Sequence, residues 1–228
     1  MSDSFELDAE GMPTLVDRSR VRERPSTARG LRTREALVAA ARRVFERDGF
    51  IEARLVDITA EANCSVGTFY TYFESKEEVF TAVIQMAQDA MMHPGLPHVE
   101  DTPENTAQIV LASNRAYLEA YRHNARLMGL LEQVATIDPK FRQLRVNRAL
   151  AFAERNARRI RALQDQGYAD PSLDARRASL ALSSMVSRTA YYMFVLEQDW
   201  DLDETVETVT ALWLNALGIP ADGSRRSQ

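Results

Sequence analysis

The chain has 228 residues, of which 45% are hydrophobic and 27% are charged, a composition that is ordinary for a soluble globular protein with a real core. The first residues are acidic and no apolar run reaches the length of a membrane span, so we expect neither a signal peptide nor a transmembrane helix. The single cysteine, Cys64, excludes an internal disulfide and favours a cytoplasmic location.

The net charge of −5 is unevenly distributed along the chain. Residues 1–17 carry five acids and no base, whereas residues 18–34 carry seven arginines against one glutamate. A compact basic block in an acidic protein is typical of a chain that binds a polyanion, although a solvated, disordered arm gives the same pattern. Residues 1–30 lack periodicity and include Pro13, Pro25 and Gly30, so we expect a flexible acidic and basic arm there.

An amphipathic helix is predicted after this arm, because apolar residues recur at helical spacing. These residues are Leu37, Ala40, Ala41, Val44 and Phe45. Asp48-Gly49 is expected to end the helix, since glycine supplies a left-handed conformation there. Two short helices follow, the first with Leu55, Ile58 and Ala62 on one side. The second runs from about residue 66 to 72, with Phe69 and Phe73 facing inward.

Ser75 to Glu78 form a capping-box pattern that predicts the start of a longer helix. Its inward side is expected to carry Val79, Phe80, Val83, Ile84 and Ala87. The proline-rich stretch 93–97 and Pro103 break the pattern, and helical periodicity then resumes. The later helices are predicted at 104–122, 125–135, 139–166, 174–198 and 203–217. No stretch alternates as a strand does, so the predicted fold is all-α, with about nine helices in a three-helix N-terminal domain and a C-terminal helical bundle.

Residues 54–73 have the features of a helix-turn-helix, in which two short helices are joined by a three-residue turn. Asn63 is the non-glycine residue that best tolerates positive φ in such a turn, and Ser65 supplies an N-cap hydroxyl for the second helix. Gly67 costs about 1 kcal/mol relative to alanine within a helix. Close approach to a phosphate backbone would explain its presence.

At these residues the chain resembles the TetR family of bacterial transcriptional regulators. The resemblance covers about residues 33–84 and rests on four matching segments with fixed spacing. They are Asp57-Ile58, the run from Ala62 to Tyr70, Tyr72-Phe73 and Ser75-Lys76-Glu77. Asn63 stands where the family usually has glycine, and Ala53-Arg54 replaces a common pair of threonines, which removes a hydroxyl cap. Cys64 replaces a small apolar residue, for which packing or redox sensing are the two interpretations.

The resemblance implies a DNA-binding site on and around the second short helix. Thr68, Tyr70, Tyr72 and Lys76 would bind phosphates, and Val66 and Thr71 would face base edges. The alternative for the two tyrosines is that they only pack within the small domain. The complete set of expected DNA-binding residues is Arg34, Arg54, Ser65, Val66, Gly67, Thr68, Tyr70, Thr71, Tyr72 and Lys76. The arginine-rich arm is a further hypothesis, since basic arms of other proteins enter the minor groove.

The resemblance also implies a homodimer, formed through helices 174–198 and 203–217, that binds double-stranded operator DNA. Both helices carry more apolar residues than a one-sided surface helix needs, although a wholly internal core would do the same. The expected domains are an arm at 1–30, a helix-turn-helix domain at 31–76, a ligand-binding and dimerisation domain at 77–219 and a disordered tail at 220–228.

A small-molecule effector site is expected inside the larger domain. The candidate residues are Tyr117, Tyr121, Met128, Leu131, Phe152, Met185, Tyr191 and Phe194. This set is apolar and aromatic with few charges, which favours a hydrophobic effector. The resemblance implies that this effector releases a repressor from its operator. We expect no cofactor, because no glycine-rich phosphate loop is present and the three histidines form no metal spacing with Cys64. The alternatives are a helical enzyme or a ligand-binding helical protein without DNA binding.

Overall fold

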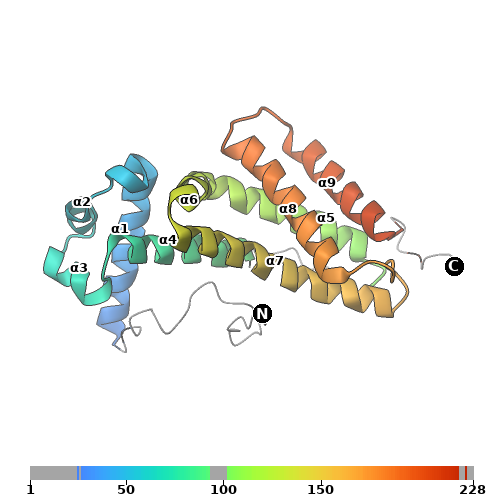
Figure 1. Cartoon of the computed structure of the whole chain (residues 1–228), viewed down its shortest axis with the longest axis horizontal. Coiled ribbons are helices and arrows are strands. Elements are labelled where there is room, and N and C mark those ends of the chain that lie inside the picture. Colours follow the sequence, from blue (N-terminus) through green and yellow to red (C-terminus); the bar gives the residue numbers. More distant parts are fainter. Residues whose placement is uncertain (1–24, 26, 93–101, 221–223, 225–228) are drawn as a thin grey trace. The chain divides into compact units, whose positions relative to one another are not determined.

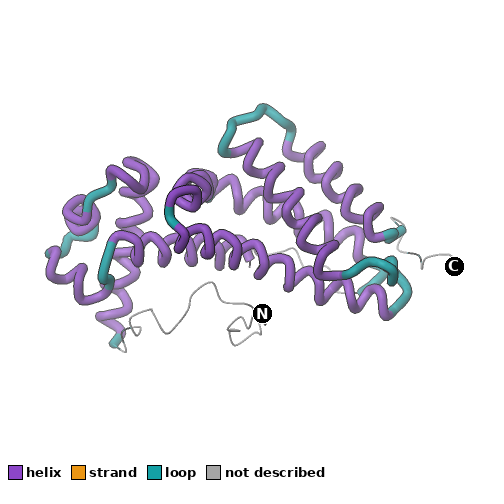
Figure 2. The backbone as a smooth tube through the Cα atoms, in the orientation of Figure 1, coloured by secondary structure: helices purple, strands orange, loops and turns teal. Residues whose placement is uncertain are grey.

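The computed structural model describes residues 25, 27–92, 102–220 and 224. Nine helices and no strand are found in these residues, which confirms the predicted all-α fold (Figures 1 and 2). The helices group into two compact units. The N-terminal unit contains residues 27–89 and 126–145, and the C-terminal unit contains residues 90–92, 102–125 and 146–220. The boundaries between the two units fall inside helices α4 and α7 and after the first residue of α6.

The N-terminal unit begins with three helices, α1 (Ala28–Glu52), α2 (Leu55–Glu61) and α3 (Val66–Tyr72). Most of α4 (Lys76–Met92) and of α6 (Ala125–Ile137) and the first residues of α7 (Pro139–Asp165) complete it. The expectation of an arm up to residue 30 is wrong at its end, because α1 already begins at Ala28. The hydroxyl of Thr27 accepts a hydrogen bond of 3.1 Å from the amide of Gly30, and this N-cap lets the helix include the glycine. The rest of the predicted arm, residues 1–24 and 26, lies outside the described residues.

Gly49 interrupts α1, with φ of 79° and ψ of 172°. The prediction of a positive φ at this glycine is confirmed. The helix does not end there, however, because one more helical turn follows and α1 ends at Glu52. A Cβ added at Gly49 would meet only the side chain of Leu130 on α6, at 4.0 Å. The positive φ, not a steric contact, therefore calls for glycine here.

Four phenylalanines from three helices form the centre of the N-terminal unit. Phe45 and Phe50 lie on α1, Phe80 on α4 and Phe141 at the start of α7. Their ring centroids are 4.9 to 5.8 Å apart, in edge-to-face, tilted and stacked pairs. Aromatic pairs at such distances stabilise a core by more than their buried area alone. The packing thus fixes α1 against α4, and the two short helices α2 and α3 lie between them in the chain.

The C-terminal unit is a bundle of α5 (Thr106–His123), the remainder of α7, α8 (Ala175–Phe194) and α9 (Leu202–Leu217). A buried hydrogen bond of 3.0 Å joins the amide of Asn114 on α5 to the hydroxyl of Thr210 on α9. The buried hydroxyl of Ser179 on α8 donates to the carbonyl oxygen of Ala153 on α7, at 2.6 Å. These polar contacts inside an apolar bundle favour one alignment of its helices, because a buried polar group without a partner is costly.

The predicted helix 174–198 ends earlier than expected, at Phe194. The amides of both Val195 and Leu196 bond to the carbonyl oxygen of Tyr191, so the last turn widens. Glu197 then takes a positive φ of 53°, which ends the helical path. The helices at 106–123, 125–137, 139–165 and 202–217 agree with their predicted positions within two residues.

The two units differ from the domains expected from the sequence. The contacts place residues 77–89 and 126–145 with the N-terminal helices, whereas the expected ligand-binding domain contained them. The division into functional domains therefore stays a prediction. Of the expected tail at 220–228, only residues 220 and 224 are among the described residues.

Candidate nucleic-acid interface

The turn between α2 and α3 has the backbone conformation that a helix-turn-helix requires. Asn63 has φ of 51°, as predicted for the turn. The hydroxyl of Ser65 accepts a hydrogen bond of 3.0 Å from the amide of Thr68, which confirms Ser65 as the N-cap of α3. The Ser65 hydroxyl thereby satisfies one of the amides that no α-helix can satisfy by itself.

The two faces of α3 differ in exposure. Phe69 and the following Phe73 are buried, with ring centroids 5.7 Å apart. Val66, Tyr70 and Thr71 are exposed, and Tyr70 has 48% of its surface open to solvent. The exposed face therefore carries side chains that can hydrogen-bond or contact methyl groups, while the phenylalanines fix the helix to its unit.

The hydroxyl groups on α3 are positioned by bonds within the helix itself. The hydroxyl of Thr68 lies 3.0 Å from that of Ser65, and the Thr71 hydroxyl donates to the carbonyl oxygen of Gly67 at 3.2 Å. Tyr70 packs its ring edge-on against Phe69, with centroids 5.7 Å apart. Tyr72 is half-buried. Since Tyr70 remains largely exposed, packing explains only part of its environment.

Two of the expected DNA-binding arginines make contacts inside the N-terminal unit. Arg54 precedes α2 without capping it and forms a two-pronged ion pair with Asp57, at 2.8 and 2.9 Å. The hydrogen bonds from Arg54 hold the pKa of the Asp57 carboxyl below its usual value. The guanidinium of Arg34 lies 5.0 Å from the centre of the Phe73 ring, a cation–π contact. Arg54 nevertheless keeps 72% of its side chain exposed.

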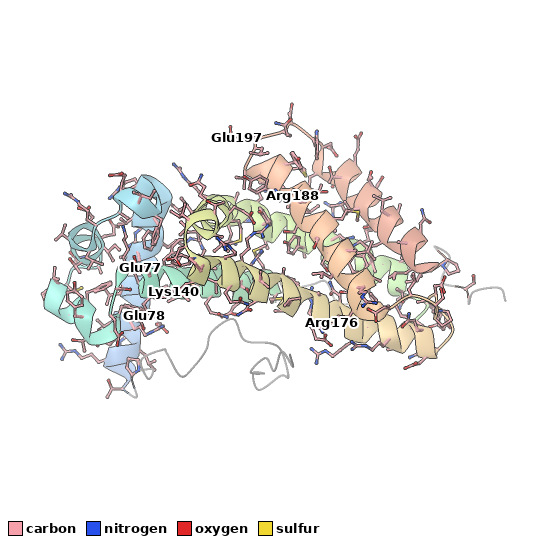
Figure 3. The ribbon with its side chains drawn as sticks, in the orientation of Figure 1. Glu77, Glu78, Lys140, Arg176, Arg188 and Glu197 are labelled. Carbon is pink, nitrogen blue, oxygen red and sulfur yellow. The ribbon has the colours of Figure 1, made fainter. Side chains whose placement is uncertain are left out.

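Lys76, at the first turn of α4, closes the loop between α1 and α2. Its ammonium donates to the carbonyl oxygens of Ile51 and Ala53, each at 3.0 Å, and lies 4.9 Å from the centre of the Phe50 ring. An ammonium has three donors, so two are used here and one remains. The acids beside it, Glu77 and Glu78, fall in the first turn of α4, where negative charge is favourable (Figure 3).

The first turns of α1 carry unbalanced positive charge. No acid lies in the first turn, and Arg29 and Arg32 are exposed without an ion pair among the described residues. Cations near a helix N-terminus oppose the helix dipole, so this arrangement costs free energy in the isolated chain. A bound polyanion would offset this unfavourable free energy, because its negative charge attracts both the arginines and the helix N-terminus.

Cys64 is half-buried in the turn before α3. Burial raises the pKa of its thiol above the ordinary value, so the thiol form prevails at neutral pH. Because the thiolate is the reactive form, the surroundings of Cys64 favour packing over redox sensing.

The expected effector-binding residues are divided between the two units. Tyr117, Tyr121, Phe152 and Phe194 form a linked cluster in the C-terminal unit, with ring centroids 5.4 to 6.4 Å apart. Tyr191, also in this unit, has the Arg188 guanidinium 5.0 Å from its ring centre, and Met185 precedes it on α8. Met128 and Leu131 belong to the N-terminal unit instead, where both are buried. The contact of any of these residues with an effector stays a prediction.

Two arginines next to this cluster were not singled out by the sequence analysis. Arg148 and Arg155 both lie on α7, and their guanidinium carbons are 5.4 and 5.3 Å from the centre of the Phe152 ring. They stand four residues before and three residues after Phe152, which is the helical spacing of one face. That spacing was the available signal, but it does not reveal which arginines are buried.

The apolar residues of the two predicted dimer helices divide into core and surface. Leu182 and Val186 on α8, with Val206 and Trp213 on α9, are buried within the single chain. The exposed apolar residues on and between these helices are Leu180, Tyr192, Leu196, Trp200 and Leu212. The rings of Tyr192 and Trp200 are tilted toward each other, with centroids 6.1 Å apart. Each helix therefore contributes to the core and to an exposed apolar surface, and the use of that surface in a dimer stays a prediction.

Two further classes of site are absent from the part of the chain that the structure describes. None of its helices combines the length and apolarity needed to cross a bilayer. No three side chains of histidine, cysteine, aspartate or glutamate there gather closely enough to hold a metal ion.

Two family models match the chain. The model of bacterial regulatory proteins of the tetR family matches residues 37–83, which contain α2 and α3. The model of the C-terminal domain of the transcriptional regulator EthR matches residues 111–218, most of the C-terminal unit. The matches fall on both units.

Curated relatives extend this likeness over most of the chain. The HTH-type transcriptional regulator EthR of Mycolicibacterium smegmatis is 25% identical over 205 residues, which cover 90% of this chain and 93% of that protein. The HTH-type transcriptional regulator UidR of Escherichia coli K12 is 25% identical over 153 residues, covering 66% and 76% of the two chains.

Solved structures show the same fold. A transcriptional regulator from Rhodococcus sp. Rha1 aligns with a TM-score of 0.64 at 18% identity, covering 82% of this chain and 98% of that one. The fatty acid degradation regulator FadR from Bacillus halodurans aligns with a TM-score of 0.60 at 18% identity, covering 82% and 97%. At this identity the likeness concerns the fold alone.

Proposed function

Because the chain belongs to the TetR family of bacterial transcriptional regulators, we propose that it binds operator DNA as a homodimer through α3 and acts in the cytoplasm as a repressor. A small molecule bound in the C-terminal unit releases it from the operator. The relatives are named as regulators of transcription, and regulation without catalysis is the function of this chain. The single observation that carries the proposal is the exposed, capped helix α3 after a turn with positive φ.

The polar groups of α3 support contact with the DNA backbone. Phosphates are bound by hydroxyls and by amides at helix starts. The hydroxyls of Ser65, Thr68, Tyr70 and Tyr72 act in this way, together with the remaining N–H of Lys76. Arg34 and Arg54 add positive charge at the edge of the site, and the unpaired Arg29 and Arg32 extend it along α1.

Sequence choice comes from Val66 and Thr71, which are exposed on α3. The Thr71 hydroxyl already donates its proton to Gly67, so its oxygen lone pairs and its methyl group remain for a base edge. An apolar Val66 suits a thymine methyl group. A dimer presents two copies of α3 to successive major grooves about 34 Å apart.

Effector binding acts by changing the spacing of these two helices. A ligand that prefers a conformer with mismatched spacing shifts the population toward it. Moving occupancy from nearly all to nearly none requires about 5.5 kcal/mol of differential affinity. The effector has an apolar body, because the aromatic cluster of Tyr117, Tyr121, Phe152 and Phe194 offers apolar surface in the C-terminal unit.

Gly67 provides a direct test of the DNA-binding role. A Cβ at this position would meet only the Ser65 hydroxyl, at 3.6 Å, so alanine fits the folded chain. Gly67→Ala therefore raises the free energy of unfolding by about 1 kcal/mol, because alanine is the better helix former. The same methyl group obstructs close approach to a phosphate and weakens operator binding.

The test measures urea unfolding together with electrophoretic retardation of DNA from the chain's own promoter. Gly167→Ala is a control in the C-terminal unit for the effect of stability alone: its φ of 79° makes alanine destabilising there, and it is expected to leave retardation unchanged. A wild-type chain that retards no promoter fragment would refute the proposed function. Unchanged affinity in a stabilised Gly67→Ala variant would remove α3 from the interface.

A further inference from the structure

Arg148 is a buried cation without an adequate acceptor. Only 8% of the residue is exposed, and its Nε atom has no hydrogen-bond partner. Its Nη2 atom donates only to the thioether sulfur of Met91, at 3.5 Å, and sulfur is a weak acceptor. Its remaining contact is the face of Phe152. Removing a guanidinium from water costs several kcal/mol unless an anion or strong hydrogen bonds replace the solvent.

Arg155, about two turns after Arg148 on the same face of α7, adds a second positive charge beside the same ring. Its Nη1 atom donates to the carbonyl oxygen of Met92 at the end of α4, at 2.9 Å, and its Nε atom donates to Asn156 at 3.3 Å. Burial lowers the pKa of Arg155, and the neighbouring Tyr117 opposes that effect. Its partners are neutral, so its charge is solvated by dipoles and not cancelled.

Other arginines of α7 show what a balanced environment looks like. Arg145 pairs with Glu132, and Arg161 pairs with Glu154. Within the described residues, neither Arg148 nor Arg155 lies within ion-pair distance of a carboxylate. Two positive charges thus converge on Phe152, and no carboxylate of the described residues pairs with either of them. A ligand that brings a negative charge would supply such a partner.

We propose that the effector is an anionic amphiphile, whose carboxylate or phosphate binds Arg148 beside Phe152 and whose apolar part lies against Tyr117 and Tyr121. The inference rests on the proposed function and refines it, because it adds a charged group to the apolar effector. The fork of N–H groups on a guanidinium matches the oxygens of either anion. Arg155 supports the site by its charge, and Phe152 holds both guanidinium groups.

The experiment uses three probes with the same alkyl chain, namely decanoate, decyl phosphate and decanol. Calorimetric titration of the full-length protein measures the Kd of each. We expect at least one anion to bind the wild-type chain more tightly than decanol does. Arg148→Met weakens binding of that anion by about ten- to a hundredfold, as expected for lost hydrogen bonds to a charged group, and leaves decanol unchanged. Arg161→Met, on the exposed side of α7, leaves all three unchanged.

Stability of the ligand-free protein separates this role from a structural one. If Arg148 serves a ligand, Arg148→Met unfolds at the same temperature as the wild type or higher, because an unpaired buried charge is removed. If Arg148 serves the fold, the variant unfolds at lower temperature and the inference fails. Arg148→Lys keeps the positive charge but loses the forked N–H groups of the guanidinium. We expect it to retain part of the anion affinity, and it allows the test if Arg148→Met fails to fold.

The probes also identify the source of the anion. Decanoate binding alone indicates a carboxylate effector, and decyl phosphate binding alone indicates a phosphate. A wild-type chain that binds neither anion, or that binds decanol equally well, overturns the inference. Promoter retardation by the same samples is independent of this outcome. Retardation without anion binding would leave the regulator intact, whereas anion binding without retardation would contradict the proposed function.

Discussion

The ammonium of Lys76 and the carbonyl oxygen of Ala53 are 3.0 Å apart, so the first turn of α4 holds the residue that follows α1. The second carbonyl partner, Ile51, lies in the turn after the kink in α1. One side chain therefore fixes the loop from which the two short helices start. Its third N–H group has no partner among the described residues and is available to a phosphate.

Lys76→Met is expected to change two quantities at once. The free energy of unfolding falls by about 1–3 kcal/mol, because hydrogen bonds from a charged donor to two carbonyls are lost. The slope of log affinity against log salt falls by about 1, because one phosphate contact is lost. Urea unfolding and retardation at several salt concentrations measure the two. Lower stability with an unaltered salt slope would mean that Lys76 stabilises the loop after α1 but does not contact a phosphate.

Tyr70→Phe tests a single hydroxyl on the exposed face of α3. The ring contact with Phe69 is kept, so the unfolding midpoint is expected to change little. Operator affinity falls about tenfold, since a hydrogen bond to a charged phosphate is lost. Thr136→Val is the control, because it also removes one hydroxyl from an exposed position but lies on α6, outside α3 and the apolar surface of α8 and α9. Equal affinities of wild type and Tyr70→Phe would mean that Tyr70 only packs.

Glycine substitutions at the two described non-glycine residues with positive φ are expected to differ in effect. Asn63 and Glu197 have φ of 51° and 53°. Asparagine tolerates this region, whereas for most side chains it costs about 1–2 kcal/mol. Glu197→Gly therefore raises the free energy of unfolding by about 1 kcal/mol, and Asn63→Gly leaves it within about 0.5 kcal/mol, after the entropy lost by glycine. Thermal or urea unfolding decides, and equal gains at both sites would contradict the expectation.

Leu212→Glu tests the apolar surface of α8 and α9 as the dimer interface. Leu212 is 47% exposed in the single chain, so the substitution spares the core of the C-terminal unit. A buried charge at the interface is expected to convert the dimer into monomers, which light scattering detects as a halved mass. Leu111→Glu, at a 39% exposed position on α5, keeps the wild-type mass. If Leu212→Glu remains dimeric, the interface lies elsewhere.

Local chemistry made much of the fold predictable. The N-cap at Ser65, the positive φ at Asn63 and the buried faces of the short helices depend on residues a few positions apart. Helix ends were less accurate, because Thr27 and Tyr191 accept hydrogen bonds that propensity does not reveal.

The roles of Lys76 and Arg148 could not be predicted, for a common reason. Lys76 contacts a carbonyl 25 residues away in sequence, and Arg148 contacts a sulfur 57 residues away. Whether a charged side chain is buried, and what it meets there, is decided by tertiary packing. The residue pattern predicts only a phosphate contact for Lys76 and does not reveal its bonds to the two carbonyls, and it does not distinguish Arg148 among the many arginines of α7.

The kink at Gly49 also limits how this protein can change over evolution. A larger residue there would be disfavoured by its own backbone torsion, while the side chain of Leu130 lies a full 4.0 Å from where its Cβ would be. Trimming Leu130 would therefore relieve nothing, and no second-site suppressor in α6 is expected to rescue a substitution at position 49. The requirement for glycine at position 49 comes from its own backbone torsion, so substitutions at neighbouring positions cannot remove it.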